Sequence, residues 1–203
     1  MGKNGFARMA MALCSVLRNF MSSTPRPAIR VEWQGVADAD QLVDAWYSQA
    51  KQGDADAQFN LGVAYATGRG VRQNEQCDWQ AFVWFRRAAK RGHAGAQNSV
   101  GAMYAIGRGS ERNDQQAAAW YREAAEQGHA AAQANLGLMC ANGGQGVPQD
   151  DQQAYVWLSM AAANGDSEAA HYRDVVVAKR LTPTALHVAQ MYHYIAPYPF
   201  KPT

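Results

Sequence analysis

The chain has 203 residues, of which 48% are apolar and 18% charged, so it can bury a continuous core within one domain. Its formal net charge of +2 is uneven: residues 1–30 hold five basic side chains and no acidic one, whereas residues 31–203 hold 14 basic and 17 acidic side chains. This balance argues against polyanion binding by the main part of the chain, so nucleic acid is not an expected partner. Cys14, Cys77 and Cys140 indicate no disulfide framework, because they are odd in number and stand in unrelated contexts.

The first 30 residues predict a basic amphipathic helix followed by a linker, because apolar side chains recur at helical spacing between residues 6 and 20. The apolar run of residues 9–17 is too short to cross a membrane, for which about 20 residues are needed. Three alternatives stay open: a weak secretory signal, a targeting segment that contacts a membrane surface through residues 1–20, and a helix that docks on the end of the following array. Localisation therefore stays open between the cytoplasm and export to the periplasm.

Residues 38–51 predict the second helix of an incomplete leading unit. Within it, Ser48 and Lys51 match the S-x-x-K pattern of penicillin-recognising enzymes, in which the lysine assists deprotonation of the serine. The companion S-D-N and K-T-G elements are absent from the sequence, and so short a match arises easily by chance. We interpret the pair as part of a helix surface, and we predict no catalytic residue.

A two-helix unit then repeats along the chain. Its opening glycines are Gly53, Gly92, Gly128 and, in a degenerate copy, Gly165, at intervals of 39, 36 and 37 residues. Such periods are typical of solenoids built from stacked helix pairs. The first unit carries three additional residues in the loop 71–78, and insertions of this kind often collect on a binding face.

Each first helix carries an apolar stripe and an internal glycine. In the first unit Ala57, Leu61 and Tyr65 stand four residues apart on one face, which predicts that they point into the core. Gly62 follows inside the helix, where glycine costs about 1 kcal/mol relative to alanine. We therefore expect the second helix to approach closely at this glycine and at the equivalent Gly101 and Gly137.

The second helices pair a large side chain with small ones: Trp84, Trp120 and Trp157 each stand four residues before an Ala-Ala pair. Asp114 and Asp150 are expected to cap the starts of two of these helices, since a carboxylate accepts hydrogen bonds from free amides of the first turn. The motif Thr182-Pro183 predicts a last helix at 183–194. Its Ala185, Val188, Ala189 and Tyr192 suit a terminal cap of the array.

Several polar residues in the turns could bind a metal or a phosphate, but we interpret them as helix caps. His93 and His129 occupy the position that Asp54 holds in the first unit, so we predict helix caps; a metal site would need further convergent ligands. The Gly-Arg-Gly motifs around Arg69 and Arg108 are predicted helix caps rather than phosphate loops, because no strand precedes them and no G-K-[ST] follows. These two arginines stay available for an acidic partner.

The combined pattern A-x-A-Q-x-N-L-G-x-x-Y-x-x-G-x-G, then W-[FYL]-x-x-A-A and G-[HD], closely resembles the Sel-one-like repeat family, a relative of the tetratricopeptide repeats, over residues 53–181. The resemblance implies an all-α fold, a right-handed solenoid of antiparallel helix pairs. We predict three parts: the N-terminal segment 1–30, the solenoid 31–194, and a proline- and aromatic-rich tail 195–203.

The resemblance further implies a non-enzymatic scaffold or adaptor that binds a protein or extended peptide on its inner surface, without metal or cofactor. The alternatives are a membrane-associated or exported regulatory subunit and, less favoured, an enzyme; the oligomeric state stays open. Candidate partner-binding residues are first-helix positions off the core stripe, whose small and amide side chains suit an extended peptide. They are Asn60, Val63, Ser99, Ala102, Met103, Asn135, Leu138 and Met139.

Overall fold

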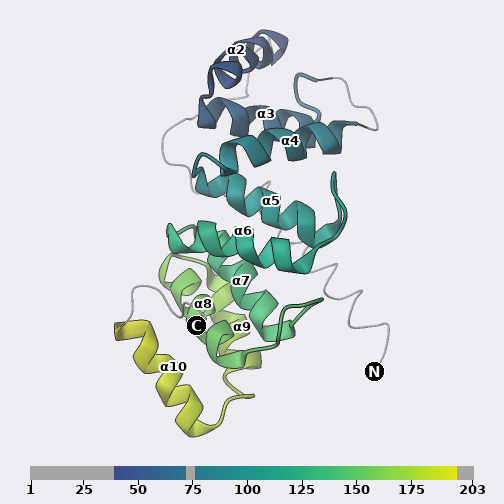
Figure 1. Ribbon diagram of the computed structural model, residues 1–203. Coiled ribbons are helices and arrows are strands. Elements are labelled where there is room, and N and C mark those ends of the chain that lie inside the picture. Colours follow the sequence, from purple (N-terminus) through teal and green to yellow (C-terminus); the bar gives the residue numbers. More distant parts are fainter. Residues whose placement is uncertain (1–38, 72–75, 196–203) are drawn as a thin grey trace. The chain divides into compact units, whose positions relative to one another are not determined.

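A computed structural model describes residues 39–71 and 76–195, all within the compact unit Asp38–Thr203. The predictions for residues 1–30 and for the tail beyond Ile195 therefore lie outside the described residues. The described part of the chain is helical apart from its connecting turns and one isolated bridge between Gly144 and Val147 (Figure 1). The predicted all-α class is confirmed.

Helices α2 to α9 follow one another in chain order within this unit, each packing on its neighbours in the sequence, whereas α10 packs on α8. The pairs α3/α4, α5/α6 and α7/α8 correspond to the three predicted units, and α2 is the predicted leading helix. The elements are α2 (Ala39–Gln52), α3 (Ala55–Thr67), α4 (Cys77–Ala89), α5 (Ala94–Ile106), α6 (Asp114–Glu126), α7 (Ala130–Asn142), α8 (Asp151–Ala163), α9 (Ser167–Tyr172), the π-helical η1 (Arg173–Val177) and α10 (Pro183–Ile195). The arrangement is a helical repeat solenoid.

Internal glycines permit the close approach of the two helices in each pair, as the sequence predicted. A Cβ atom built on Gly101 would lie 2.7 Å from Cδ1 of Tyr121, and one on Gly137 would lie 2.8 Å from Cγ of Leu158. The equivalent position at Gly62 is filled by the ring of Phe85. These distances are shorter than van der Waals contact, so any larger residue would push the helices apart.

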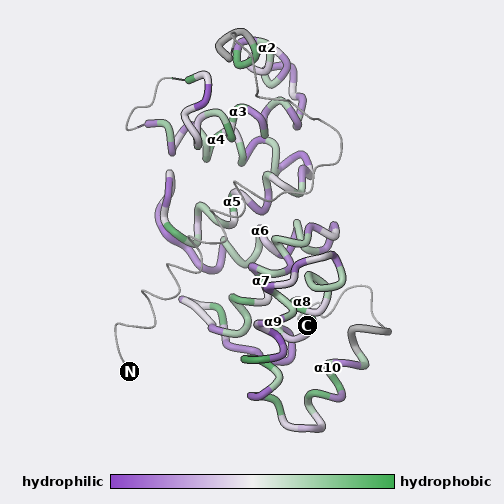
Figure 2. The backbone as a smooth tube through the Cα atoms, turned by 180° about the vertical axis from the view of Figure 1, so that it is seen from behind, coloured by the Kyte–Doolittle hydropathy of each residue, from purple (hydrophilic) through white to green (hydrophobic). Residues whose placement is uncertain are grey.

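The apolar core runs through all units rather than gathering in one. Figure 2 shows apolar residues in every helix from α3 to α8. Leu61 and Trp157 are 0% and 1% exposed, Trp84 is buried, and Trp120 is half-buried. The buried apolar residues form two clusters, one in α4 and α5 and one from α6 to α10, and the half-buried Tyr104 packs against both.

Helix N-termini confirm most of the predicted caps. Nδ1 of His93 and of His129 accepts the backbone N–H of Ala96 and of Ala132, respectively, at 3.0 and 3.3 Å. Asp150 caps α8, as predicted, by accepting the N–H of Gln153 at 2.9 Å. Capping by side-chain acceptors thus explains the residues that begin these helices.

The prediction for Asp114 was wrong, because Asn113 is the N-cap of α6 and accepts the N–H of Gln116 at 2.9 Å. Asp114 is instead buried in the first turn, where Arg112 donates to its carboxylate and the backbone N–H of Gln145 donates at 2.9 Å. The hydrogen bond from Arg112 lowers the pKa of Asp114. This carboxylate therefore joins the start of α6 to the glycine loop of the following unit.

The C-terminal end departs from the regular unit. The helix that begins at Ser167 passes into the π-helical stretch η1, where the N–H of Ala178 donates to the carbonyl of Arg173 at 2.8 Å. Thr182 caps α10 as predicted, since its Oγ1 accepts the N–H of Ala185 at 3.2 Å. The expected cap surface is only partly correct: Ala189 is buried, but Val188 is exposed; the side chain of Tyr192 lies outside the described ones.

Candidate partner-binding surfaces

The eight predicted partner-binding residues fall into two groups by exposure. Those in the first group are half-buried and accessible from outside: Asn60, Val63, Ala102 and Leu138. Those in the second group are between 4% and 7% exposed: Ser99, Met103, Asn135 and Met139. The burial of the second group means that only the first group can meet a partner without movement of the helices.

Two polar members of the buried group are hydrogen-bonded inside the array. The side-chain N–H of Asn135 donates to Oδ1 of Asn98 at 3.0 Å, and the hydroxyl of Ser99 donates to the carbonyl of Gly95 at 2.8 Å. These bonds stabilise the helices and their contacts. Sequence reasoning placed both residues on a surface because it assigned the core to a single stripe of each helix.

Val63, Ala102 and Leu138 hold the equivalent position of α3, α5 and α7, one residue after the internal glycine. All three remain half-buried although their neighbours on both sides in the sequence are buried. We call these three residues the first-helix stripe. It presents apolar side chains at the period of the repeat, a pattern that suits contact with an extended segment.

Arg108, which the sequence left available for an acidic partner, is used within the chain. Its Nη2 lies 2.6 Å from Oδ1 of Asp78, and it also donates to the carbonyl of Ala66 at 3.2 Å. The guanidinium thus links the loop after α5 to the preceding helix pair.

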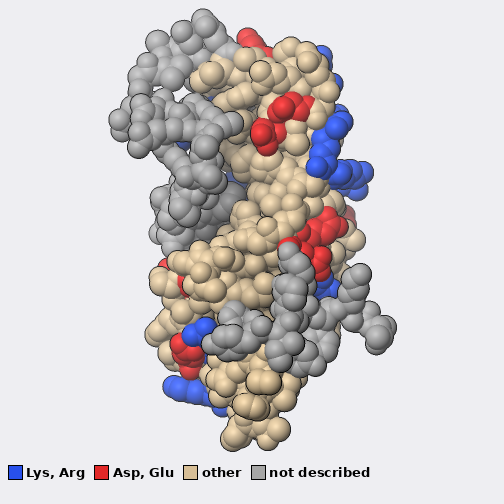
Figure 3. Space-filling view, turned by 90° about the vertical axis from the view of Figure 1, so that its left-hand side faces the viewer, with Lys and Arg blue, Asp and Glu red and all other residues tan. Residues whose placement is uncertain are grey.

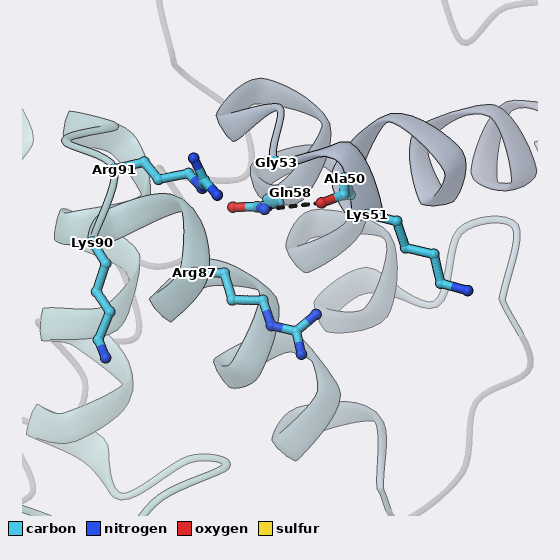
Figure 4. Close-up of a pocket in the computed structure, with 7 residues that line it drawn as sticks. All are labelled: Ala50, Lys51, Gly53, Gln58, Arg87, Lys90 and Arg91. Carbon is cyan, nitrogen blue, oxygen red and sulfur yellow. Dashed lines mark hydrogen bonds between the residues drawn. The ribbon is translucent and has the colours of Figure 1, made fainter.

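A second surface, which sequence reasoning missed, is a basic hollow between α2, α3 and α4. We call it the basic pocket; Figure 4 shows its lining, Ala50, Lys51, Gly53, Gln58, Arg87, Lys90 and Arg91. One signal could have revealed it: Lys51 and Lys90 stand two residues before Gly53 and Gly92, the same position of successive units.

No carboxylate lines the basic pocket, and its cations make no ion pair with a described residue. Nζ of Lys51 lies 4.6 Å from the ring centroid of Tyr47, and the guanidinium of Arg87 lies 4.6 Å from that of Trp84. Cation–π contact of this kind holds the side chains without neutralising their charge. Below them, Nε2 of Gln58 donates to the carbonyl of Ala50 at 3.0 Å.

An aromatic hollow adjoins the basic pocket and shares Arg87 and Lys90 with it. Its other lining residues are Trp79, Phe82, Val83 and Arg86, and Trp79 is 55% exposed. We call the two hollows together the basic–aromatic surface. Figure 3 shows basic side chains gathered along one edge of the upper part of the array, with acidic side chains beside and below them.

Of the residues considered for metal binding, His93 and His129 cap helices. Ser48 and Lys51 are exposed on α2. Within the described ranges, no group of three or more His, Cys, Asp or Glu side chains could hold a metal ion. None of the described helices combines the length and the apolarity that a membrane span requires.

The fold is that of a helical-repeat protein built from stacked helix pairs. The Sel1 repeat model matches residues 55–93, 94–129 and 130–166, more than half of the chain, and the chain therefore belongs to the Sel1 repeat family. Members of this family are generally non-catalytic and mediate protein–protein interactions. A comparison with curated proteins found no match.

Two solved structures with a similar fold belong to longer chains. One is c5321, described as a protective antigen present in uropathogenic Escherichia coli strains and displaying an SLR fold; it is 36% identical with a TM-score of 0.70. Another is a Sel1 repeat protein from Oxalobacter formigenes, 32% identical with a TM-score of 0.64. Each match covers 77% of this chain, but the chain spans only 32% of the first structure and 62% of the second.

Proposed function

We propose that this protein is a non-enzymatic scaffold that binds an extended segment of a partner protein along the first helices of its repeats. One observation carries the proposal: Val63, Ala102 and Leu138 are equivalent residues of three successive units and stay half-buried. Each of these side chains packs against the apolar core yet stays partly accessible, whereas a purely solvent-facing position would favour charged side chains. An accessible apolar row at the repeat period fits a partner whose own side chains recur along an extended backbone.

The half-buried Asn60 adds a polar group next to this row. Its side-chain amide has both N–H donors and a carbonyl acceptor, which match the donors and acceptors of a peptide backbone. Contact with the first-helix stripe would supply apolar burial, and the amide would contribute orientation. A partner held in this way needs no reaction chemistry from the scaffold.

The test is affinity purification with mass spectrometry from the source cells, using the wild-type chain, the double variant Val63→Asn with Leu138→Asn, and the control Val175→Asn. Val175 is an exposed valine in η1, so its change matches the chemistry of the substitution at another place. We expect the double variant to lose about tenfold or more of the captured partner while the control retains it. Equal capture by all three folded proteins would disprove the proposed site.

A further inference from the structure

We propose that the basic–aromatic surface of the first unit binds an acidic segment of the partner, in which carboxylates stand beside an apolar side chain. This inference rests on the proposed function, because it specifies the chemistry of the partner. It concerns different residues, however: those that line the two hollows rather than those of the first-helix stripe. The two proposals can therefore fail independently.

The charge of the basic pocket is the first argument. Lys51, Arg87, Lys90 and Arg91 line it without any carboxylate. Four like charges in one hollow repel one another, and their field attracts an anion. Arginine binds carboxylates through two parallel hydrogen bonds, so Arg87 and Arg91 supply specific donors as well as charge.

A comparison of the units gives the second argument. Gln58, Gln97 and Gln133 occupy one position in three units, and each donates through Nε2 to the carbonyl of the alanine eight residues earlier. In the second and third units, Oε1 of this glutamine accepts a hydrogen bond from Gln127 at 2.5 Å or from Asn164 at 2.8 Å.

The first unit breaks this pattern, because Arg91 stands where the later units have Gln127 and Asn164. Oε1 of Gln58 is buried and accepts no hydrogen bond from the described residues. In Figure 4 the guanidinium of Arg91 lies on the side of Gln58 to which this oxygen points. Since a guanidinium has five N–H donors, Arg91 can donate to Gln58 with one edge and to a bound carboxylate with another.

The second unit limits how far an anionic ligand can extend. Glu123 and Glu126 are exposed at the positions that Arg87 and Lys90 hold in the first unit. A polynucleotide strand that continued along the array would meet these carboxylates and be repelled. A short acidic peptide segment avoids them, and the exposed Trp79 beside Val83 offers contact to its apolar neighbour.

The experiment selects ligands from a displayed library of random 12-residue peptides with the immobilised full-length chain. A synthetic copy of the most enriched peptide is then titrated by fluorescence anisotropy. One variant, Arg87→Glu with Lys90→Glu, introduces the residues of the second unit; another, Arg91→Gln, introduces the partner that the second unit gives to its glutamine. The control Lys179→Glu reverses one exposed charge outside the surface. It is compared with the single variant Arg87→Glu, which reverses one charge within the surface.

We expect the selected peptides to be enriched in Asp and Glu beside an apolar residue. Their dissociation constant should rise about tenfold or more in Arg87→Glu/Lys90→Glu and in Arg91→Gln, change less than about twofold in Lys179→Glu, and rise with salt. The unfolding midpoint of Arg91→Gln should not fall, because glutamine can donate to Gln58. Circular dichroism of each variant checks that it is folded.

Selected peptides without acidic enrichment, or peptides that bind all variants equally, would overturn the inference. Tighter binding of a 12-nucleotide single strand, or of phosphatidylserine vesicles, would overturn it in favour of another anion. Self-association by sedimentation that disappears in Arg87→Glu/Lys90→Glu would instead identify a second copy as the occupant. If partner capture still depends on Val63 and Leu138 in any of these cases, the proposed function stands and only the acidic specificity fails.

Discussion

Asn135 on α7 donates its side-chain N–H to Oδ1 of Asn98 on α5 at 3.0 Å, and both residues are buried. The bond joins the first helices of two successive units across 37 residues of sequence. A buried amide pair of this kind fixes how one unit sits on the next, because no water can replace the lost partner.

Replacing Asn135 by alanine should therefore lower the free energy of unfolding by about 1–3 kcal/mol, since Oδ1 of Asn98 loses its donor. Asn60→Ala is the matched control, because Asn60 holds the equivalent position of the first unit but is half-buried and should change stability by about 0.5 kcal/mol or less. Urea unfolding of both variants measures the difference. A similar loss of unfolding free energy in both variants would show that the hydrogen bond between Asn135 and Asn98 does not stabilise the fold more than the half-buried Asn60 does.

Gly101→Ala should destabilise the protein by about 1–3 kcal/mol, because the added methyl would collide with the ring of Tyr121. Helix propensity alone predicts the opposite sign, a gain of about 1 kcal/mol. Ala119→Gly, at an exposed position of α6, measures the propensity effect without the packing effect. Stabilisation by Gly101→Ala in thermal or urea unfolding would contradict the close approach of α5 and α6.

The protein should lose stability on mild acidification through His129. Burial lowers the pKa of His129, with a further contribution from the charge of His93, and its Nδ1 accepts a hydrogen bond, which requires the neutral ring. In the unfolded chain the ring takes up a proton near its ordinary pKa of about 6.5, whereas the folded ring does so only at lower pH. Stability is thus full above that value and falls as pH drops from it towards the folded pKa.

His129→Asp should reduce this loss, because aspartate can cap this helix as Asp54 and Asp166 cap the equivalent ones. The reference pKa of aspartate, about 3.9, lies below the pH range tested. Denaturant titrations at pH 7.5 and 5.5 measure the change in unfolding free energy, which for one proton is at most about 1.4 kcal/mol per pH unit. The variant His93→Asp is measured in the same way. If His129→Asp and His93→Asp both keep the pH dependence of the wild-type chain, other groups cause the acid sensitivity.

Leu61→Ala should cost about 2–5 kcal/mol, because this leucine is 0% exposed in the interior of the first unit. Ser48→Ala, on the exposed surface of α2, should stay within about 0.5 kcal/mol. Urea unfolding compares the two. Equal effects would refute the assignment of the buried face of the helices.

Much of the candidate site lay beyond sequence reasoning for a geometric reason. Each first helix is flanked by helices of its own unit and of the neighbouring units, so its buried surface is wider than one stripe and covers Ser99 and Asn135. The basic pocket draws Lys51, Gln58 and Arg91 from three consecutive helices and the turns after them. Its charge becomes visible only when those helices are placed side by side.

The sequence by itself determined the helix pairs, their period and most of their ends, because these depend on local chemistry: glycine at the turns, a side-chain acceptor at the helix start, and apolar side chains four residues apart. Even so, Asn113 and Asp114 are both suitable caps, and only the backbone conformation selected Asn113. Which polar residues are buried, and which cations face one another, depends on contacts between units. Those contacts join residues about 30–40 positions apart, so only the tertiary structure could decide them.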